Sequence, residues 1–232
     1  MIVRRVVVAL SALVLVGAAL APVALADAPT DALKAAVGRT AAAKTGRVAV
    51  VQRTTVGGRI LESAASGVLA GGDSDLVVSG EGGNTRRVSV GTQVKERRPD
   101  PAGPWRPSTR PAPTQATPFA GAVLKDGTSI GDPKLYRSVT DAGTETLSQG
   151  VARKLLGDLD MAAVAAAMQL STSDVARMAQ WKATLTFWIS PDGRVARNAL
   201  AIVIPSASGA TTTLDVSIDL SDLDAPLVVT LP

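Results

Sequence analysis

Residues 182–232 decide the fold of this chain, and they read KATLTFWISPDGRVARNALAIVIPSASGATTTLDVSIDLSDLDAPLVVTLP. Two segments, 184–189 and 211–220, alternate apolar and polar residues with the period of two that is typical of a half-buried strand. The apolar rows comprise Leu185, Phe187 and Ile189 in the first segment and Leu214, Val216, Ile218 and Leu220 in the second. A shift by one residue would move each row into water, so the pattern also fixes the strand register.

Turn residues between these segments indicate an antiparallel meander. Residues 190–193, Ser-Pro-Asp-Gly, combine a proline that presets φ, an aspartate that bonds its own backbone and a glycine that accepts positive φ. Residues 194–204 form the predicted return strand, and Pro205 marks the next loop. We expect an antiparallel sheet with one apolar and one solvated face, and we place Trp188 with the threonines on the solvated face.

The rest of the chain extends this pattern into an α+β domain. Apolar spacing predicts a helix over 30–45, capped by Thr30 or Asp31 and ended by Gly46. Further along, an alanine-rich helix with Asp160 as its N-cap precedes a second short helix. The predicted strands are 47–56, 59–69, 74–79, 85–97 and the arms of a hairpin over 144–159 that turns at Gln149-Gly150, and the two later helices are 160–170 and 171–180. Residues 120–143 carry no clear pattern.

The first 26 residues form a separate segment. Arg4 and Arg5 precede an uncharged apolar run, and Ala24-Leu25-Ala26 matches the A-x-A cleavage pattern. We interpret residues 1–26 as a cleaved Sec signal peptide and residues 27–232 as a single domain. The alternative is an uncleaved anchor, because residues 6–26 are uncharged and just long enough to span a bilayer.

Composition narrows the chemistry of the mature chain. The sequence has no histidine and no cysteine, which excludes Ser-His-Asp and Cys-His catalysis, histidine-ligated zinc, disulfides and a lipid-modified cysteine. Loss of Arg4 and Arg5 leaves 22 basic against 20 acidic residues, so charge gives no reason to expect nucleic acid.

Asp215 and Asp219 share a strand face but lie about 13 Å apart, too far for a glycosidase pair. We expect no catalytic residues, no metal and no cofactor.

Two segments leave alternatives open. Residues 99–118 contain seven prolines, which is typical of a solvated linker and also compatible with a flap that carries Trp105 over a cavity mouth. Four arginines flank this segment: Arg97, Arg98, Arg106 and Arg110. They form either a plain solvated charge cluster or a basic rim that meets anionic lipid headgroups. Methionines in the later helical segment either fill the core or line an adjustable apolar site.

Turn and strand segments along most of the mature chain follow one another in a recognisable order. They are Val88 to Lys95, Gly103-Pro104-Trp105, the hairpin over 143–161, the strand 184–189, the turn 191–195, the strand 211–218 and a short terminal strand over 224–229. In this order they resemble the actinobacterial cell-envelope family that includes LppX and LprG, of the LolA/LolB-like fold. The resemblance implies a strongly curved antiparallel β-sheet, a half-barrel, with helices packed on its concave face. It also implies a hydrophobic cavity between them for the acyl chains of lipids or lipoglycans.

The first functional hypothesis is a secreted or extracytoplasmic envelope protein, not lipid-anchored because it lacks cysteine, that binds or transfers a lipid or acylated glycolipid without catalysis. Transient contact with a membrane surface would accompany this function. The expected cavity lining is Leu185, Phe187, Ile189, Leu214, Val216 and Ile218 from the sheet, with Met161 and Met168 opposite. The second hypothesis is an envelope sensor or scaffold of the same fold that binds a partner protein.

Overall fold

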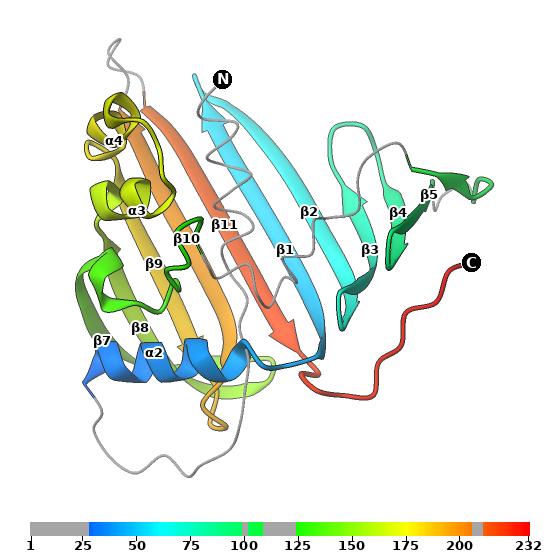
Figure 1. Cartoon of the computed structure of the whole chain (residues 1–232), viewed down its shortest axis with the longest axis horizontal. Coiled ribbons are helices and arrows are strands. Elements are labelled where there is room, and N and C mark those ends of the chain that lie inside the picture. The colour runs from blue at the N-terminus through cyan, green and yellow to red at the C-terminus, as the bar shows by residue number, and fades with distance from the viewer. Residues whose placement is uncertain (1–27, 99–101, 109–123, 206–210) are drawn as a thin grey trace.

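An eleven-stranded antiparallel sheet forms the body of the protein (Figure 1). The computed structural model describes residues 28–98, 102–108, 124–205 and 211–232, so the predicted signal peptide lies outside the described residues. The strands are β1 (Thr45–Val56), β2 (Arg59–Ala70), β3 (Asp73–Ser79), β4 (Thr85–Val90), β5 (Gln93–Arg97), β6 (Arg106–Pro107), β7 (Tyr136–Leu147), β8 (Gly150–Leu159), β9 (Lys182–Ile189), β10 (Val195–Pro205) and β11 (Thr211–Ser221). The helices are α2 (Pro29–Thr40), the 3-10 helix η1 (Pro133–Leu135), α3 (Met161–Ala167) and α4 (Thr172–Met178).

Pairing of β1 with β11 joins two meanders into this one sheet. The strand order is β6-β5-β4-β3-β2-β1-β11-β10-β9-β8-β7, so the N-terminal meander fills one half and the C-terminal meander the other. Their shared register runs from Arg47 opposite Ser221 to Val56 opposite Thr212. The sheet curves and stays open, with β6 and β7 at its edges (Figure 1). The predicted α+β half-barrel with helices on its concave face is confirmed.

The described helices lie over one half of the concave face (Figure 1). α2 crosses one end of the β7–β10 region, and α3 and α4 lie at its other end (Figure 1). Among the described residues, no helix lies over β2–β5 (Figure 1). The described residues also contain no helix with the length and apolar character needed to cross a membrane. The two halves of the concave face therefore differ in the described helices that pack on them.

Helix α2 is shorter than predicted. Pro29 occupies its first turn and Ala28 is the N-cap without a side-chain hydrogen bond, so the predicted caps Thr30 and Asp31 are wrong. The helix ends at Thr40, whose Oγ1 donates to the Ala36 carbonyl at 3.0 Å and accepts the Val195 N–H at 2.7 Å. These bonds fix the helix end against β10.

Gly46 is also placed differently from the prediction. It lies in β1 opposite Leu69, not at the end of a helix. The later caps are confirmed: Asp160 accepts hydrogen bonds from the Ala162 and Ala163 N–H groups, and Ser171 accepts one from the Asp174 N–H.

Two strand predictions are corrected, and part of one unpatterned stretch proves to be a strand. The predicted strand 85–97 is two strands, β4 and β5, because Gly91 turns the chain with φ of +55° and its N–H donates to Asp73 at 2.8 Å. The unpatterned stretch before residue 144 contains the start of β7, at Tyr136. Residues 224–229 form no strand; Asp224 there pairs with Arg194 at 2.9 Å and accepts the Lys44 N–H at 3.0 Å.

Trp188 lies on the outer face, as predicted, but it is not solvated. It is 8% exposed and forms a small outer cluster with Leu147, Ala152 and Ala196. Lys154 and Arg197 lie over its ring, at 5.0 and 5.7 Å from the centroid. The aliphatic stems of these two residues cover the indole, and their charges are attracted to the face of the ring. Strand alternation alone does not predict that Trp188 is buried.

The proline-rich segment contributes an edge strand. Arg106 and Pro107 form β6, in register with Glu96 and Lys95 of β5. The guanidinium of Arg97 lies over the Trp105 ring, and its central carbon is 4.7 Å from the ring centroid. Residues 99–101 and 109–118 of the predicted loop or flap lie outside the described residues, and the flap stays a hypothesis.

Candidate functional site

One row of side chains crosses the concave face from one half of the sheet to the other. In register, it contains Leu155, Phe187, Asn198, Ile218, Val50, Ala65, Val78 and Thr85. Directly opposed residues in an antiparallel ladder point to the same face, so all of these side chains face the helix side. Exposure rises along the row, from 1% at Phe187 to 38% at Val78. The apolar face therefore continues past the half that the described helices cover.

The eight predicted lining residues lie together in the helix-covered half. Leu185, Phe187, Ile189, Leu214, Val216, Ile218 and Met161 are buried in one core cluster, and Met168 is partly buried against it. The same cluster contains Leu33 and Val37 of α2 and also Trp181, which the sequence analysis did not select. The structure thus places these side chains on one face, and their contact with a ligand stays a prediction.

Asn198 is the polar member of the row, and the sequence analysis missed it. Its side chain is 1% exposed and lies between Phe187 and Ile218 on the neighbouring strands. Within the part of the chain that the structure describes, neither Nδ2 nor Oδ1 has a hydrogen-bond partner. Buried polar atoms are nearly always paired in folded proteins. The sequence does contain a signal that could have identified Asn198: it is a single polar residue in the otherwise apolar inward row of β10.

Tyr136 forms a fixed wall at the β7–β8 edge of this face. Its ring lies over Gly157, where a Cβ would meet the ring at 2.5 Å. The phenol donates a hydrogen bond to the Ile130 carbonyl at 2.6 Å, and burial raises the pKa of Tyr136 far above its ordinary value. A glycine in the sheet thus provides the space that the aromatic ring fills.

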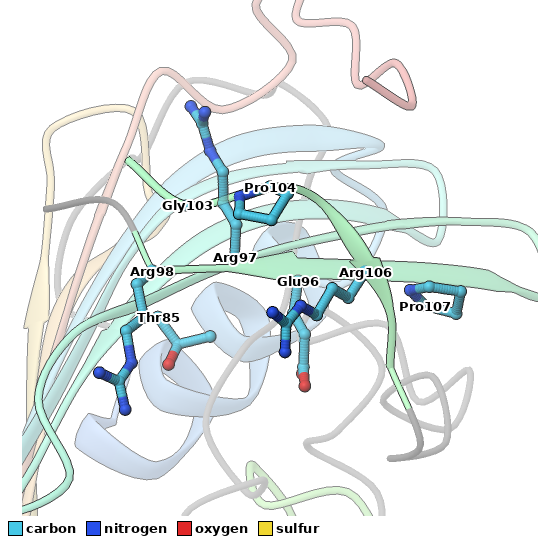
Figure 2. Close-up of a pocket in the computed structure, with 8 residues that line it drawn as sticks. All are labelled: Thr85, Glu96, Arg97, Arg98, Gly103, Pro104, Arg106 and Pro107. Atoms are coloured by element: carbon cyan, nitrogen blue, oxygen red, sulfur yellow. The ribbon is translucent and has the colours of Figure 1, made fainter. Parts of the chain in front are cut away.

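A pocket of about 540 Å³ lies at the opposite edge, between β4, β5 and β6 (Figure 2). It is lined by Thr85, Glu96, Arg97, Arg98, Gly103, Pro104, Arg106 and Pro107. In Figure 2 the side chains of Glu96, Arg98 and Arg106 extend to one side of the strands, and that of Arg97 extends to the other. We call this the edge pocket.

A second row on the concave face ends at the edge pocket. In register, it contains Leu220, Val48, Gly67, Leu76, Arg87, Glu96 and Arg106. Leu220 and Val48 belong to the core cluster, and Leu76 packs against it. A Cβ at Gly67 would overlap the carbonyl oxygen of Asp75, so only glycine allows this close approach of β2 and β3. The edge pocket and the core therefore share one face of the sheet.

The shifted pKa values of carboxylates are all lowered, that of Asp126 by hydrogen bonds from Thr128 and the other two beside basic partners. A hydrogen bond from Lys154 at 2.7 Å lowers the pKa of Glu145, and bonds from the Gly143 N–H and Arg153 lower the pKa of Asp141. A catalytic acid needs a raised pKa instead. A second crevice, of about 360 Å³, lies by the β9–β10 turn, where Arg194 pairs with Asp224. Within the described residues, no group of acidic side chains has a metal-binding arrangement.

Comparison with known proteins identifies the fold. LprF from Mycobacterium bovis shares 15% sequence identity at a TM-score of 0.51, over 88% of this chain and 96% of that one. The lipoprotein LppX from Mycobacterium tuberculosis shares 13% identity at a TM-score of 0.51, over 88% of this chain and 98% of that one. No protein-family model and no curated protein sequence matches. At this identity the similarity shows the fold alone, and the predicted LppX-like fold is confirmed.

Proposed function

We propose that this protein binds the acyl chains of a lipid or acylated glycolipid on the concave face of its sheet, without catalysis, in an extracytoplasmic compartment. One observation carries the proposal: the apolar cross-sheet row continues from the packed core onto β1–β3, past the described helices. The family resemblance predicted from the sequence implies the same use of this fold.

The energetics suit reversible binding. Transfer of an acyl chain from water to an apolar face gains about 0.8 kcal/mol per methylene. Association and ordering oppose this by about 4–15 kcal/mol. A chain of ordinary length therefore retains a modest surplus, as a carrier that releases its lipid requires.

Asn198 offers the bound lipid a polar contact within the apolar face. Its unpaired amide carries both a donor and an acceptor, and the carbonyl of an ester or amide linkage would accept from Nδ2. We therefore propose that a carbonyl group along the bound chain, remote from the headgroup, contacts Asn198, with the eight predicted lining residues around the chain.

The test is a pair of substitutions on one strand. Ala65 lies in the concave row between Val50 and Val78, whereas Ala64 faces outward between Val51 and Ser79. Ala65→Trp should weaken binding of a fluorescent fatty acid by about tenfold, because an indole that displaces two methylenes removes about 1.6 kcal/mol. Ala64→Trp is the matched control and should bind as the unmodified protein does. Equal affinity of the two variants would contradict the proposed location.

A second candidate function, the binding of a partner protein, is favoured by the outer face. Ile60 and Val203 are 60% and 40% exposed there, in one row with Thr55 and Thr213. The interspersed threonines keep this apolar area small. Capture of a protein partner that Ile60→Lys abolishes, with no bound lipid, would favour this candidate.

A further inference from the structure

The edge pocket carries an excess of positive charge on the concave face. Arg87, Glu96 and Arg106 lie side by side in register, and Arg98 follows Glu96 two residues along the same face. With Arg87, which lies beside the pocket but does not line it, three guanidiniums and one carboxylate leave a net charge of +2 on this face. Within the described part of the chain, neither Arg98 nor Arg106 forms an ion pair, and both are exposed.

The spacing of these side chains suits one small anion. Arg98 is the diagonal neighbour of Arg106 across the ladder, a separation of about 7–8 Å between Cα atoms. Side chains as long as arginine's converge easily over that distance, and guanidinium groups match phosphate oxygens with paired N–H donors. The Thr85 hydroxyl lines the same pocket.

Neighbouring contacts hold the pocket in shape. The Ser108 hydroxyl donates to Glu96 at 2.8 Å and thereby orients this carboxylate. The Gly103 N–H donates to the Arg98 carbonyl at 3.1 Å, which holds Gly103 beside the end of β5. On the other face, Arg97 stacks on Trp105, and Arg86 pairs with Asp75 at 2.6 Å. These contacts leave Arg98 and Arg106 as the two cations available to a ligand.

The apolar residues of the concave face lie next to the arginines of the edge pocket. β2 and β5 are three strand spacings apart, about 14 Å. An acyl chain lying over Ala65 and Leu76 would thus have its polar end beside the edge pocket. An anionic amphiphile needs an apolar surface for its chain and a cationic group for its headgroup. The apolar row and the arginines at its end provide both.

We propose that the edge pocket binds a phosphate group, through Arg98 and Arg106, and that this phosphate belongs to the headgroup of the bound lipid. The headgroup assignment depends on the proposed lipid-binding function, whereas the phosphate site itself does not. The ligand class is therefore narrowed to acyl lipids with a phosphate next to the acyl linkage.

The experiment compares ligands with matched acyl chains. The protein is incubated with vesicles that contain phosphatidylglycerol or diacylglycerol, and the bound lipid is quantified by native mass spectrometry. In parallel, inorganic phosphate is titrated while the indole N–H resonance of Trp105 is followed by NMR. Both measurements are repeated on R98A/R106A, on R98K/R106K and on a charge-matched control, R137A/R177A, whose arginines are exposed ion-pair residues elsewhere. Thermal unfolding checks that each variant folds.

We expect the protein to prefer phosphatidylglycerol over diacylglycerol by about tenfold or more, as two charge-assisted contacts predict. R98A/R106A should lose this preference but keep diacylglycerol binding, R98K/R106K should retain part of it, and R137A/R177A should retain all of it. If inorganic phosphate shifts the Trp105 resonance only when Arg98 and Arg106 are present, but lipid choice is unaffected, the site takes a free phosphate compound and the headgroup assignment fails.

If no ligand responds to R98A/R106A, the phosphate site is overturned. If no lipid binds at all, the proposed function fails while the phosphate titration still tests the pocket.

Discussion

Phe187→Ala is expected to lower the free energy of unfolding of the lipid-free protein by about 3–5 kcal/mol. Phe187 is 1% exposed in the core cluster, between Leu155 on β8 and Asn198 on β10. Truncation removes the ring from close-packed surroundings and leaves a cavity that the sheet cannot close. Urea denaturation followed by circular dichroism measures the change.

The control for this prediction is on the same strand. Thr186 is partly exposed on the outer face of β9, and Thr186→Ala should change the free energy of unfolding by less than about 1 kcal/mol. A loss below about 1 kcal/mol for Phe187→Ala would show that the helix-covered half is loosely filled, contrary to the packing described above.

Asn198→Leu is expected to stabilise the lipid-free protein by about 2–4 kcal/mol and to weaken lipid binding. Leucine has nearly the same shape, and it removes two buried polar atoms that have no partner within the described residues. Each unsatisfied buried group costs about 1–3 kcal/mol. A ligand carbonyl that bonds to Nδ2 would lose this contact in the variant.

Two measurements check this trade-off: urea denaturation of the delipidated protein, and affinity for an ester lipid compared with a hydrocarbon of similar length. Only the ester lipid should bind more weakly. Thr54→Val, on the same face but partly exposed, is the control and should change stability by about 0.5 kcal/mol or less. Destabilisation by Asn198→Leu would mean that the amide has a structural partner instead.

Local pattern predicted the C-terminal meander well. The alternation around Phe187 and Ile218 and the Ser190–Gly193 turn both specify short-range structure, and both are confirmed. The seam between β1 and β11 could not be read in this way. It pairs residues such as Arg47 and Ser221, far apart along the chain, and no local period encodes that choice.

The candidate site was predictable to a similar extent. The apolar lining follows from strand alternation, whereas the sequence left the arginines beside the proline-rich segment open between a solvated charge cluster and a basic rim. Asn198 was not recognised because a single polar residue in a strand usually faces solvent. Its burial is determined by the register of β10 between β9 and β11, which only the assembled sheet fixes.

Native mass spectrometry of the protein, purified from its own cell envelope without detergent, tests the central claim most directly. Lipid binding predicts a mass above that of the polypeptide, which organic extraction removes and which fragments to an acyl chain and a phosphate-bearing headgroup. A polypeptide mass alone, together with no uptake of lipid from vesicles by the extracted protein, would contradict the account.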